Sequence, residues 1–600
     1  MQGVFMCGII GIIKQNTCDK DVVDLLKQLE YRGYDSSGFA YQKDGKIFAV
    51  KALGEIDELK KQVSGTTFTT AIAHTRWATH GNVSLQNTHP HLSQNNKWAL
   101  VHNGIIENFT NIKKELIGDG FAFNGETDSE VIVNLLQKYD EENKVKTLLS
   151  CTKKLIGSYA ILCISNDRPD TLFLAKNKSP LYIGTNQNKV IVSSDIISFG
   201  KTIKNYYCLE DGEICEASTK KLTFYNKNGN KIEKKCKKIS HIEKNIDSNN
   251  QSHYMIKEIN QTSNVLKRII TFYQQKKVFK FLTKDFIKKF NKIVLVGCGT
   301  AYHASLLGEH YFRKHACIDA KAFISSEFIY SSPIIDDYTL CVLISQSGET
   351  ADTISACEMA KKCKATTIAL TNVNHSTLSQ MCDYTLPVCA GTEISVASTK
   401  AYIAQVAILY MLSMYLRNLI FKKSTNFIKK LKKLSENTLF FSQNKINKIV
   451  TKICETNKVI FLGRNLDYVT ALESSLKLKE VSYINSSAYP TGELKHGYLA
   501  LVDNQTYALI FITQPHLINK SLNGANEVAS RGGKVILITP YSITKQKINY
   551  YKRIKLPKFD NNLMPIQSII FGQLLAYHTS VYKSINPDKP KNLAKSVTVE

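Results

Sequence analysis

The sequence predicts an α+β domain followed by two α/β domains, each a doubly wound parallel sheet covered by helices. A chain of 600 residues is too long for one hydrophobic core, so several domains are expected. Short β-like runs dominate the first 235 residues, whereas strand-like and helix-like segments alternate in the rest. The second half also carries two copies of one pattern, which indicates a duplicated domain.

The first domain is expected over residues 7–235. Its β-like runs include CGIIGII, TTAIAHTRWA and KWALVHNGII, and helical patterns interrupt the runs at Asp21–Leu29 and Ser129–Lys138. This mixture is typical of an α+β domain with stacked sheets. The stretch that follows, residues 236–254, is polar and lacks apolar periodicity, so it is interpreted as a linker.

The repeat in the second half is faint but regular. KIVLVGCGTAY (292–302) and KVIFLGRNLDY (458–468) are both strand-like runs that end in a glycine turn. In each copy a glutamate follows 30 residues after that glycine, at Glu327 and at Glu493. The strand-like runs are apolar throughout, as expected where helices cover both faces of a parallel sheet. We therefore expect one α/β domain at 255–430, a second at 445–590, and a C-terminal tail at 591–600.

The composition argues against several classes of function. The net charge is +27, but the lysines are scattered and no stripe interleaves basic and aromatic residues, so no nucleic-acid partner is expected. The 15 cysteines form no CxxC pair, which argues against a disulfide framework or a zinc site and favours a cytoplasmic protein. The apolar stretch Tyr402–Phe421 contains Gln405 and Arg417, so we expect a buried or interface helix and no membrane span. No motif requires a metal or an organic cofactor.

Cys7 is the strongest candidate nucleophile. If residues before it are removed, its α-amino group, with an ordinary pKa of about 7.7–8.0, lies beside its own thiol and can serve as a base. A thiol activated in this way attacks carboxamides, as in the N-terminal-nucleophile hydrolases. The alternative is a buried strand cysteine within VFMCGIIGII.

The first copy of the repeat carries a candidate phosphate site, the run Ser345-Gln346-Ser347-Gly348-Glu349-Thr350. It follows a strand and precedes a helix, where hydroxyls and backbone N–H groups can bind an anion. Without a Walker lysine, a sugar phosphate is favoured over a nucleotide triphosphate. Thr300, in a glycine turn that lacks the third glycine of a dinucleotide site, can assist. An ordinary helix cap remains the alternative, and the second copy has lost this run, so one phosphate pocket per chain is expected.

The second copy places Glu473, Lys477 and Glu480 on one face of a predicted helix. Two carboxylates and an ammonium there can move protons at C1 and C2 of a sugar. A solvated face with a Glu–Lys pair is the ordinary alternative. His496, in the glycine-flanked loop GELKHG, is a further acid or base candidate.

Taken together, these residues resemble the glutamine–fructose-6-phosphate aminotransferase (isomerising) family, the glucosamine-6-phosphate synthases. The resemblance covers nearly the whole chain. Its motifs are CGIIG, YRGYDSSG, HTRWATHG, NTHPH, HNGIIEN and GETDSE in the first half, and SQSGETADT, GTEISVASTKA, LESSLKLKE, GELKHG and NLAKSVTVE in the second. The resemblance implies an N-terminal-nucleophile glutaminase domain that supplies ammonia to two SIS (sugar isomerase) domains, which convert fructose 6-phosphate and glutamine to glucosamine 6-phosphate and glutamate.

For the glutaminase half, the resemblance implies that Cys7 is the nucleophile and that Asn103 and the Gly104 N–H form the oxyanion hole. Arg76 then binds the α-carboxylate of glutamine and Asp128 its α-ammonium. Further pocket residues implied by the resemblance are Thr79, His80 and His89, with Trp77 gating the path of ammonia. A metal cluster of His74, His80, His89, His91 and His102 is a weak alternative, because no carboxylate or HExxH spacing supports it.

For the isomerase half, the resemblance implies that the phosphate of the sugar binds Thr300, Ser345, Gln346, Ser347 and Thr350, and that Ser398 contacts the sugar. It implies that His496 opens the sugar ring and that Lys595 forms a Schiff base with the ketone. It also implies that Glu480 moves the proton between C1 and C2 with support from Lys477 and Glu473. Family members are homodimers in which the histidine of ELKHG enters the neighbouring subunit's site.

One departure from the family concerns the start of the chain. Residues Met1–Met6 precede Cys7, and we expect translation to begin at Met6 and an aminopeptidase to expose Cys7; a cleaved propeptide is the second choice. If these residues stayed attached, Cys7 would have an acylated nitrogen and no base. Two other functions remain open: a non-catalytic sugar-phosphate-binding protein, and a glutaminase or deglycase relative.

Overall fold

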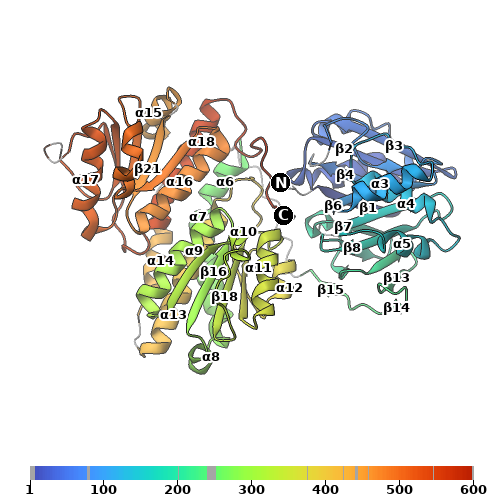
Figure 1. The fold of residues 1–600 in the computed structure, drawn as a ribbon, viewed down its shortest axis with the longest axis horizontal. Coiled ribbons are helices and arrows are strands. Elements are labelled where there is room, and N and C mark those ends of the chain that lie inside the picture. The colour runs from blue at the N-terminus through green and yellow to red at the C-terminus, as the bar shows by residue number, and fades with distance from the viewer. Residues whose placement is uncertain are drawn as a thin grey trace. The chain divides into compact units, whose positions relative to one another are not determined.

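The computed structural model describes residues 7–77, 81–200, 202–239, 252–373, 376–422, 425–438, 443–456, 458–544, 546 and 548–597. The chain divides into two compact units, residues 1–246 with 596–600, and residues 247–595. Figure 1 shows both units as ribbons. Most of the stretch interpreted as a linker lies outside the described residues.

The first unit contains two antiparallel sheets. The eight-stranded sheet has the order β15 (Lys237–Lys238), β11 (Asn205–Cys208), β9 (Tyr182–Asn186), β10 (Lys189–Ser193), β1 (Gly8–Cys18), β4 (Thr67–Arg76), β2 (Ser36–Lys43) and β3 (Lys46–Leu53). The seven-stranded sheet has the order β14 (Lys231–Ile232), β13 (Leu222–Tyr225), β12 (Ile214–Ala217), β8 (Leu172–Asn177), β7 (Gly157–Ser165), β6 (Trp98–Ile106) and β5 (His91–Leu92).

Side-chain alternation along β1 explains how the layers of this unit form. Ile9 and Ile13 point into the core between the two sheets, whereas Ile10 and Ile12 point to the opposite face, beneath a helix. That outer face is covered by α1 (Asp19–Lys27) and α2 (Ile56–Lys60), and the outer face of the other sheet by α3 (Phe109–Gly118), α4 (Ser129–Lys138) and α5 (Lys144–Thr152). Burial on both faces accounts for the continuous apolar run CGIIGII, and the predicted stacked-sheet α+β architecture is confirmed.

The second unit contains two five-stranded parallel sheets of identical topology. The first has the order β17 (Asp319–Ile324), β16 (Lys292–Gly297), β18 (Thr339–Ser345), β19 (Thr366–Thr371) and β20 (Tyr384–Pro387). The second has the order β22 (Ser486–Pro490), β21 (Val459–Gly463), β23 (Tyr507–Phe511), β24 (Lys534–Thr539) and β25 (Lys552–Lys555). The sheets therefore confirm the predicted repeat and its two doubly wound domains.

Helices cover both faces of each sheet (Figure 1). In the first lobe and at its borders these are α6 (Tyr254–Asn260), α7 (Thr262–Gln275), α8 (Lys284–Lys288), α9 (Thr300–Tyr311), α10 (Ser325–Phe328), α11 (Ala351–Lys362), α12 (Thr377–Met381), α13 (Lys400–Phe421) and α14 (Phe427–Glu436). The second lobe has α15 (Gln443–Cys454), α16 (Leu466–Ser482), α17 (Ile518–Ala529) and α18 (Met564–Tyr582). One continuous apolar core runs through both lobes.

The apolar helix α13 lies inside this core. By length and composition it is the one helix among the described residues that could cross a membrane, with a mean hydropathy of 1.4, but 72% of its apolar window is buried in the protein. Tyr402, Ile408 and Leu412 are among its side chains in the core of the unit. The predicted buried helix is thus observed.

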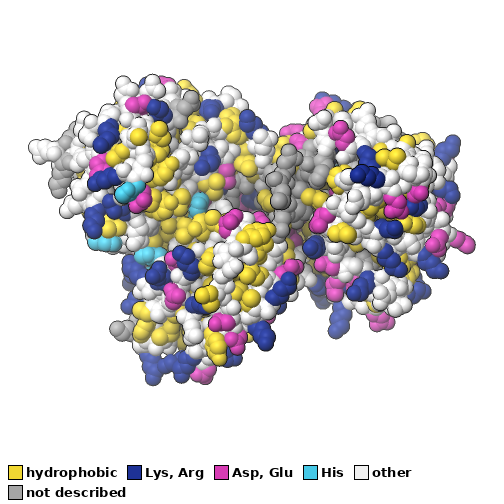
Figure 2. Space-filling view, viewed as in Figure 1, with side chains coloured by type: hydrophobic (Ala, Val, Ile, Leu, Met, Phe, Trp, Pro, Cys, Tyr) yellow, Lys and Arg dark blue, Asp and Glu magenta, His cyan; other side chains and the backbone are white. Residues whose placement is uncertain are grey.

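Charged side chains are distributed over the surface rather than gathered into one patch on the face shown in Figure 2. Lys and Arg side chains are interspersed there with Asp and Glu on both units. The positive net charge is spread over this face, in keeping with a compositional lysine bias.

The close packing of α16 on α18 supports the site described below and can be tested directly. A methyl group at Gly572 would lie 2.8 Å from Cβ of Ser474 on α16. We expect Gly572→Ala to lower the free energy of unfolding by about 1–3 kcal/mol, because overpacking outweighs the better helix propensity of alanine. Guanidinium unfolding measures the change.

Gly118→Ala is the matched control, because Gly118 ends α3 with nothing within 4 Å of the added methyl group. We expect its free energy of unfolding to change by at most about 0.5 kcal/mol. Equal midpoints for both variants would contradict the close α16–α18 contact.

Candidate active sites

Cys7 lies directly before β1, in contact with the end of β4. Its sulfur accepts the N–H of Trp77 at 3.3 Å, and its thiol donates to the Trp77 carbonyl at 3.6 Å. Burial raises the pKa of the Cys7 thiol to about 11, although the Trp77 N–H and the Arg76 guanidinium oppose the shift. The thiol is therefore protonated near neutral pH, and it needs a base to become a nucleophile.

Three charged side chains act on this thiol: Arg76, Asp35 and Asp128. The Arg76 guanidinium, at the end of β4, donates to the carbonyls of Asn82 at 3.3 Å and Gly81 at 3.4 Å. Asp128, at the start of α4, accepts the N–H of Ile106 at 2.8 Å. Arg76 lowers and Asp128 raises the pKa of Cys7, so both lie within electrostatic range of the sulfur. A cation and an anion beside a thiol suit the carboxylate and ammonium groups of an α-amino acid.

Asn103 and Gly104 follow one another on β6. The Asn103 amide donates to the Cys7 carbonyl at 2.7 Å. Gly104 has φ +136°, and a side chain there would come within 2.7 Å of the Ser158 carbonyl carbon, so glycine is required. The Asn103 amide thus contacts the backbone of Cys7, where a neutral donor could stabilise an oxyanion.

The histidines of this unit pack on one another. The rings of His74 and His89 stack with centroids 4.1 Å apart, and His91 meets His89 edge-on at 4.6 Å. Burial lowers the pKa of all three and of His102, so they are neutral near pH 7. Within the described ranges no group of three or more His, Cys, Asp or Glu residues could hold a metal ion. Thr79 and His80 lie outside the described residues.

Sequence reasoning did not assign Tyr34 or Asp35, which the structure places in this site. The Tyr34 ring packs edge-on against the Trp77 indole at 4.9 Å, and the Asp35 N–H donates to the Arg76 carbonyl at 3.0 Å. Both residues lie in the YRGYDSSG motif, and this motif was the signal in the sequence that could have identified them as site residues.

In the second unit, the run from Ser345 to Thr350 connects β18 to the start of α11. The hydroxyls of Ser345 and Thr350 lie 2.8 Å apart, and Ser345 also accepts the Gly348 N–H at 3.0 Å. Ser347 accepts the Glu349 N–H at 3.2 Å. Gly348 has φ +68°, and a side chain there would lie 2.8 Å from the Thr371 hydroxyl. Three hydroxyls, the half-buried Gln346 side chain and the α11 N-terminus thus meet in one turn.

The helix face predicted on α16 is buried, and the solvated-face alternative is wrong. The Glu473 and Lys477 side chains are 0% and 1% exposed. The Lys477 ammonium lies 2.6 Å from a Glu480 oxygen and 3.5 Å from a Glu473 oxygen. Burial opposes the charge on Lys477, but the carboxylates of Glu473 and Glu480 raise its pKa above the ordinary value. Burial also raises the pKa of Glu480, and Lys477 opposes that shift.

Two residues from α9 complete this cluster. Thr300 accepts a hydrogen bond from Lys477 at 3.0 Å and donates to Glu473 at 3.1 Å. His303 Nδ1 lies 2.6 Å from the other oxygen of Glu473. Thr300 therefore contacts the proton-transfer candidates, and its only hydrogen bonds among the described side chains are with them. Sequence reasoning missed His303, for which only the helical spacing after Thr300 offered a signal.

Lys595 is held by a glutamate that sequence reasoning did not assign. Its ammonium lies 2.5 Å from Glu393 and 2.8 Å from the Ser395 carbonyl. The same Glu393 oxygen accepts the Ser398 hydroxyl at 3.1 Å, which brings Ser398 and Lys595 together. Glu393 also raises the pKa of Lys477, so the two clusters lie within electrostatic range of each other.

A second buried carboxyl group lies behind this contact. Glu258 of α6 accepts the N–H groups of Ile394 at 2.5 Å and Ser395 at 3.3 Å. Burial and the neighbouring Glu393 carboxylate raise the pKa of Glu258 to about 8, whereas Lys595 holds the pKa of Glu393 below its ordinary value against the effect of burial. Near neutral pH the pair therefore carries one negative charge, on the glutamate that contacts Lys595.

His496 is not joined to these clusters within one chain. It lies on the exposed helical turn η5 (Glu493–His496), and no hydrogen bond or ion pair among the described residues connects it to them. The neighbouring Lys495 pairs with Glu527 of α17 at 3.0 Å.

Comparisons with known families agree with this division of the chain. A model of a glutamine amidotransferase domain matches residues 74–201, and a model of the SIS domain matches residues 286–415 and again 452–578. Fold and site together define a glutamine amidotransferase domain joined to a pair of SIS domains.

Relatives extend the match to nearly the full chain. A glutamine–fructose-6-phosphate aminotransferase (isomerizing) from Caldanaerobacter subterraneus subsp. tengcongensis is 40% identical over 611 residues, which cover 99% of this chain and 100% of that protein. The enzyme of the same name from Clostridium tetani is 38% identical over 614 residues, with the same coverage. The chain belongs to the family of isomerizing glutamine–fructose-6-phosphate aminotransferases, so the resemblance inferred from its motifs is confirmed.

A solved structure supports the fold of the second unit. The C-terminal domain of glucosamine–fructose-6-phosphate aminotransferase from Francisella tularensis has a TM-score of 0.54 and 32% identity, over 57% of this chain and 99% of that one.

The raised pKa of Glu258 makes stability depend on pH. Its folded-state pKa of about 8 exceeds the ordinary 4.5, so between these values the folded state keeps a proton that the unfolded chain has released. Stability therefore falls as pH rises through this window. We expect Glu258→Gln, which cannot ionise, to show a smaller fall in melting temperature from about pH 6 to about pH 8.5 than the parent.

Glu115→Gln is the control, because pairing with Lys138 lowers the pKa of this surface carboxyl and its titration lies below the window. Its melting temperature should change with pH as the parent's does. An unaltered slope in Glu258→Gln would show that Glu258 is ionised in the folded protein.

Proposed function

We propose that this chain converts D-fructose 6-phosphate and L-glutamine to D-glucosamine 6-phosphate and L-glutamate, the first step of amino-sugar synthesis. Membership of the family supports the reaction. The observation that carries it is that one chain holds both a half-buried thiol within electrostatic range of Arg76 and Asp128 and a buried Lys–Glu cluster that contacts Thr300 of the first lobe.

In the glutaminase half, Cys7 attacks the carboxamide carbon of glutamine. Arg76 binds the α-carboxylate of the substrate and Asp128 its α-ammonium, and Trp77 gates the exit of ammonia. Asn103 and the Gly104 N–H stabilise the oxyanion. Collapse of the tetrahedral intermediate expels ammonia and leaves a thioester, which water hydrolyses to glutamate. His89, and Thr79 and His80 outside the described residues, complete the proposed pocket.

The base for this attack is the α-amino group of Cys7 itself. The thiol is protonated near neutral pH, and among the described residues it bonds only to the Trp77 backbone. Removal of residues 1–6, which lie outside the described residues, frees an amine whose ordinary pKa of about 7.7–8.0 suits a base.

In the isomerase half, Ser345, Gln346, Ser347 and Thr350 bind the phosphate, and Thr300 links that end of the sugar to the α16 cluster. Ser398 orients the sugar. The Lys595 amine condenses with the open-chain ketone, releasing water, and ammonia then displaces it from C2.

Proton transfer completes the conversion of ketose to aldose. Glu480 removes the proton from C1 and returns it at C2, while Lys477 and Glu473 stabilise the charge that develops. Glu393 holds Lys595 by a 2.5 Å contact and can take the proton that its ammonium loses before attack.

We further propose a homodimer in which His496 opens the sugar ring in the neighbouring subunit's site. Its exposure, and the absence of a bond between it and the α16 cluster among the described residues, support this arrangement. The proposed domain limits are 7–235, 255–430 and 445–590, with 236–254 as linker and 591–600 as an active-site tail.

Replacement of the nucleophile tests the glutaminase assignment. We expect Cys7→Ala to lose glutamine-dependent synthesis by a factor on the order of 10³ or more, while synthesis from ammonium salts and sugar-phosphate isomerisation continue. Product assays with each nitrogen donor measure the split.

Cys236→Ala, which removes an exposed thiol elsewhere, should retain all three activities. Intact-mass analysis of the parent should give a chain that begins at Cys7. Full glutamine-dependent activity in Cys7→Ala, or in protein that keeps residues 1–6, would refute the nucleophile assignment.

Mixing two inactive variants tests the shared site. If His496 acts in the partner's site, then dimers that combine His496→Ala with Lys595→Ala contain one intact site. Equal mixtures that exchange subunits should recover about a quarter of the parent isomerase activity. No recovery above the separate variants, despite exchange shown by native mass spectrometry, would place His496 in its own subunit's site.

A further inference from the structure

The internal repeat gives the second lobe a turn that matches the one before α9, and this turn lines a cavity. In the first copy, the turn before α9 contains Gly299, with φ 50° and ψ −118°. In the second copy, Asn465 occupies the corresponding position before α16, with φ 55° and ψ −123°. The two turns therefore have the same backbone conformation, and each opens toward the helix that follows the other.

Each turn faces the helix that begins at the other turn: the turn before α9 faces α16, and the turn before α16 faces α9. The turn before α9 presents Thr300 to Glu473 and Lys477 on α16. Asn465, in the turn before α16, lines a cavity of about 470 Å³, and the other lining residues follow one another along α9 and the short π-helix η4 (Phe312–Ala316). They are Leu306, Glu309, His310, Arg313 and Lys314. The volume is in the range of small-molecule sites, roughly 300–1,000 Å³.

The charges in this cavity are the reverse of those in the catalytic cluster. The spacing that relates Gly297 to Gly463 equates Glu473 with Leu307 and Glu480 with Lys314. The second cavity thus lacks the two carboxylates that proton transfer at C1 and C2 needs. Its acidic lining residue, Glu309, is paired with Arg313 at 3.5 Å. The cavity is therefore suited to binding an anion and unsuited to isomerisation.

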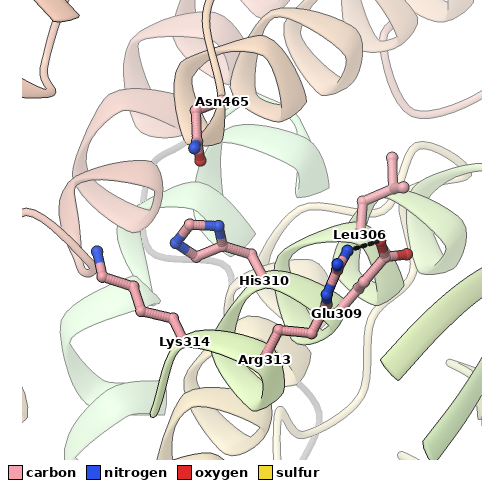
Figure 3. A pocket seen from close by; sticks show the side chains of 6 residues that line it. All are labelled: Leu306, Glu309, His310, Arg313, Lys314 and Asn465. Carbon is pink, nitrogen blue, oxygen red and sulfur yellow. Dashed lines mark ion pairs between the residues drawn. The ribbon is translucent and has the colours of Figure 1, made fainter. Parts of the chain in front are cut away.

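Figure 3 shows how the donors lie around this space. His310 lies between Lys314 on one side and the Arg313–Glu309 pair on the other, and Asn465 points toward it from the opposite helix. His310 Nε2 is buried and has no hydrogen-bond partner among the described residues. Among the described residues the Lys314 ammonium donates to Asn562 at 3.1 Å, and an ammonium has two further N–H donors.

The backbone at Asn465 is a separate sign of a constrained site. A positive φ combined with ψ near −120° is a region that glycine occupies readily and that other residues avoid. The first copy has glycine there, whereas the second keeps the conformation with an asparagine whose amide faces the cavity. Such outliers persist where the surroundings impose them, often in ligand-binding turns.

We propose that this cavity is a second, non-catalytic binding site for a small phosphomonoester of the size of a hexose phosphate. Arg313 and Lys314 supply charge-assisted donors to the phosphate, and Asn465 and His310 supply neutral donors to it or to the attached hydroxyls. The proposal does not depend on the reaction proposed above, because none of these residues belongs to the catalytic clusters.

Binding stoichiometry tests the proposal. By isothermal titration calorimetry, the parent should bind fructose 6-phosphate at two sites per chain. The double variant Arg313→Ala/Lys314→Ala should keep the catalytic site at its parent affinity and bind at the other at least about tenfold more weakly. Lys288→Ala/Lys289→Ala, which removes two exposed charges from and beside α8, should behave as the parent.

A separate variant distinguishes the two sites, and a second titrant distinguishes the two sources of the anion. Ser345→Ala/Thr350→Ala should lose binding of fructose 6-phosphate at the catalytic site and keep it at the second site. Inorganic phosphate that displaces the sugar phosphate from the second site with equal affinity would identify free phosphate as the ligand; much weaker displacement would identify the phosphomonoester. One site per chain in the parent, or two undiminished sites in the folded Arg313→Ala/Lys314→Ala variant, would overturn the proposal.

Discussion

The buried ammonium of Lys477 is the interaction on which the second unit depends. An unpaired charge in such a position would cost several kcal/mol, so the surrounding structure must supply partners. It does so from two helices: Glu473 and Glu480 come from α16 itself, and Thr300 comes from α9 of the other lobe. The partners of this one charge therefore join the two copies of the repeat across α9 and α16, in addition to the apolar core that the lobes share.

The first unit uses burial in the opposite way. Burial raises the pKa of the Cys7 thiol and so keeps it protonated and unreactive, and among the described residues only the Trp77 backbone hydrogen-bonds to its sulfur. Reactivity then depends on the chain terminus, because an α-amino group on the same residue needs no further side chain to reach the thiol. One half of the protein thus stabilises a charge inside the fold, and the other keeps its nucleophile neutral until a base is present.

Regular patterns made much of this predictable from sequence. Short β-like runs predicted the stacked sheets, the Gly297 and Gly463 turns predicted the duplicated lobe, and helical spacing placed Glu473, Lys477 and Glu480 on one face. Burial of that face was not predictable, because a face that carries Glu473, Lys477 and Glu480 is usually solvated, whereas α16 contacts protein nearly all round. Glu258 and Glu393 were missed for a related reason: their partnership with each other and with Lys595 joins segments far apart in the chain, and only tertiary structure brings them together.

The duplication also explains why similar backbones serve different chemistry. Two lobes with the same strand order present the same kind of turn to each other's helices, so the fold creates two comparable positions. Side chains then distinguish them. A glycine and Thr300 at one turn leave room for carboxylates that can exchange protons, whereas Asn465 at the other faces Lys314 and Arg313, which can only donate. Divergence of residues on α9 and α16 therefore changes the charge of the two positions without any change in the strand order of the sheets.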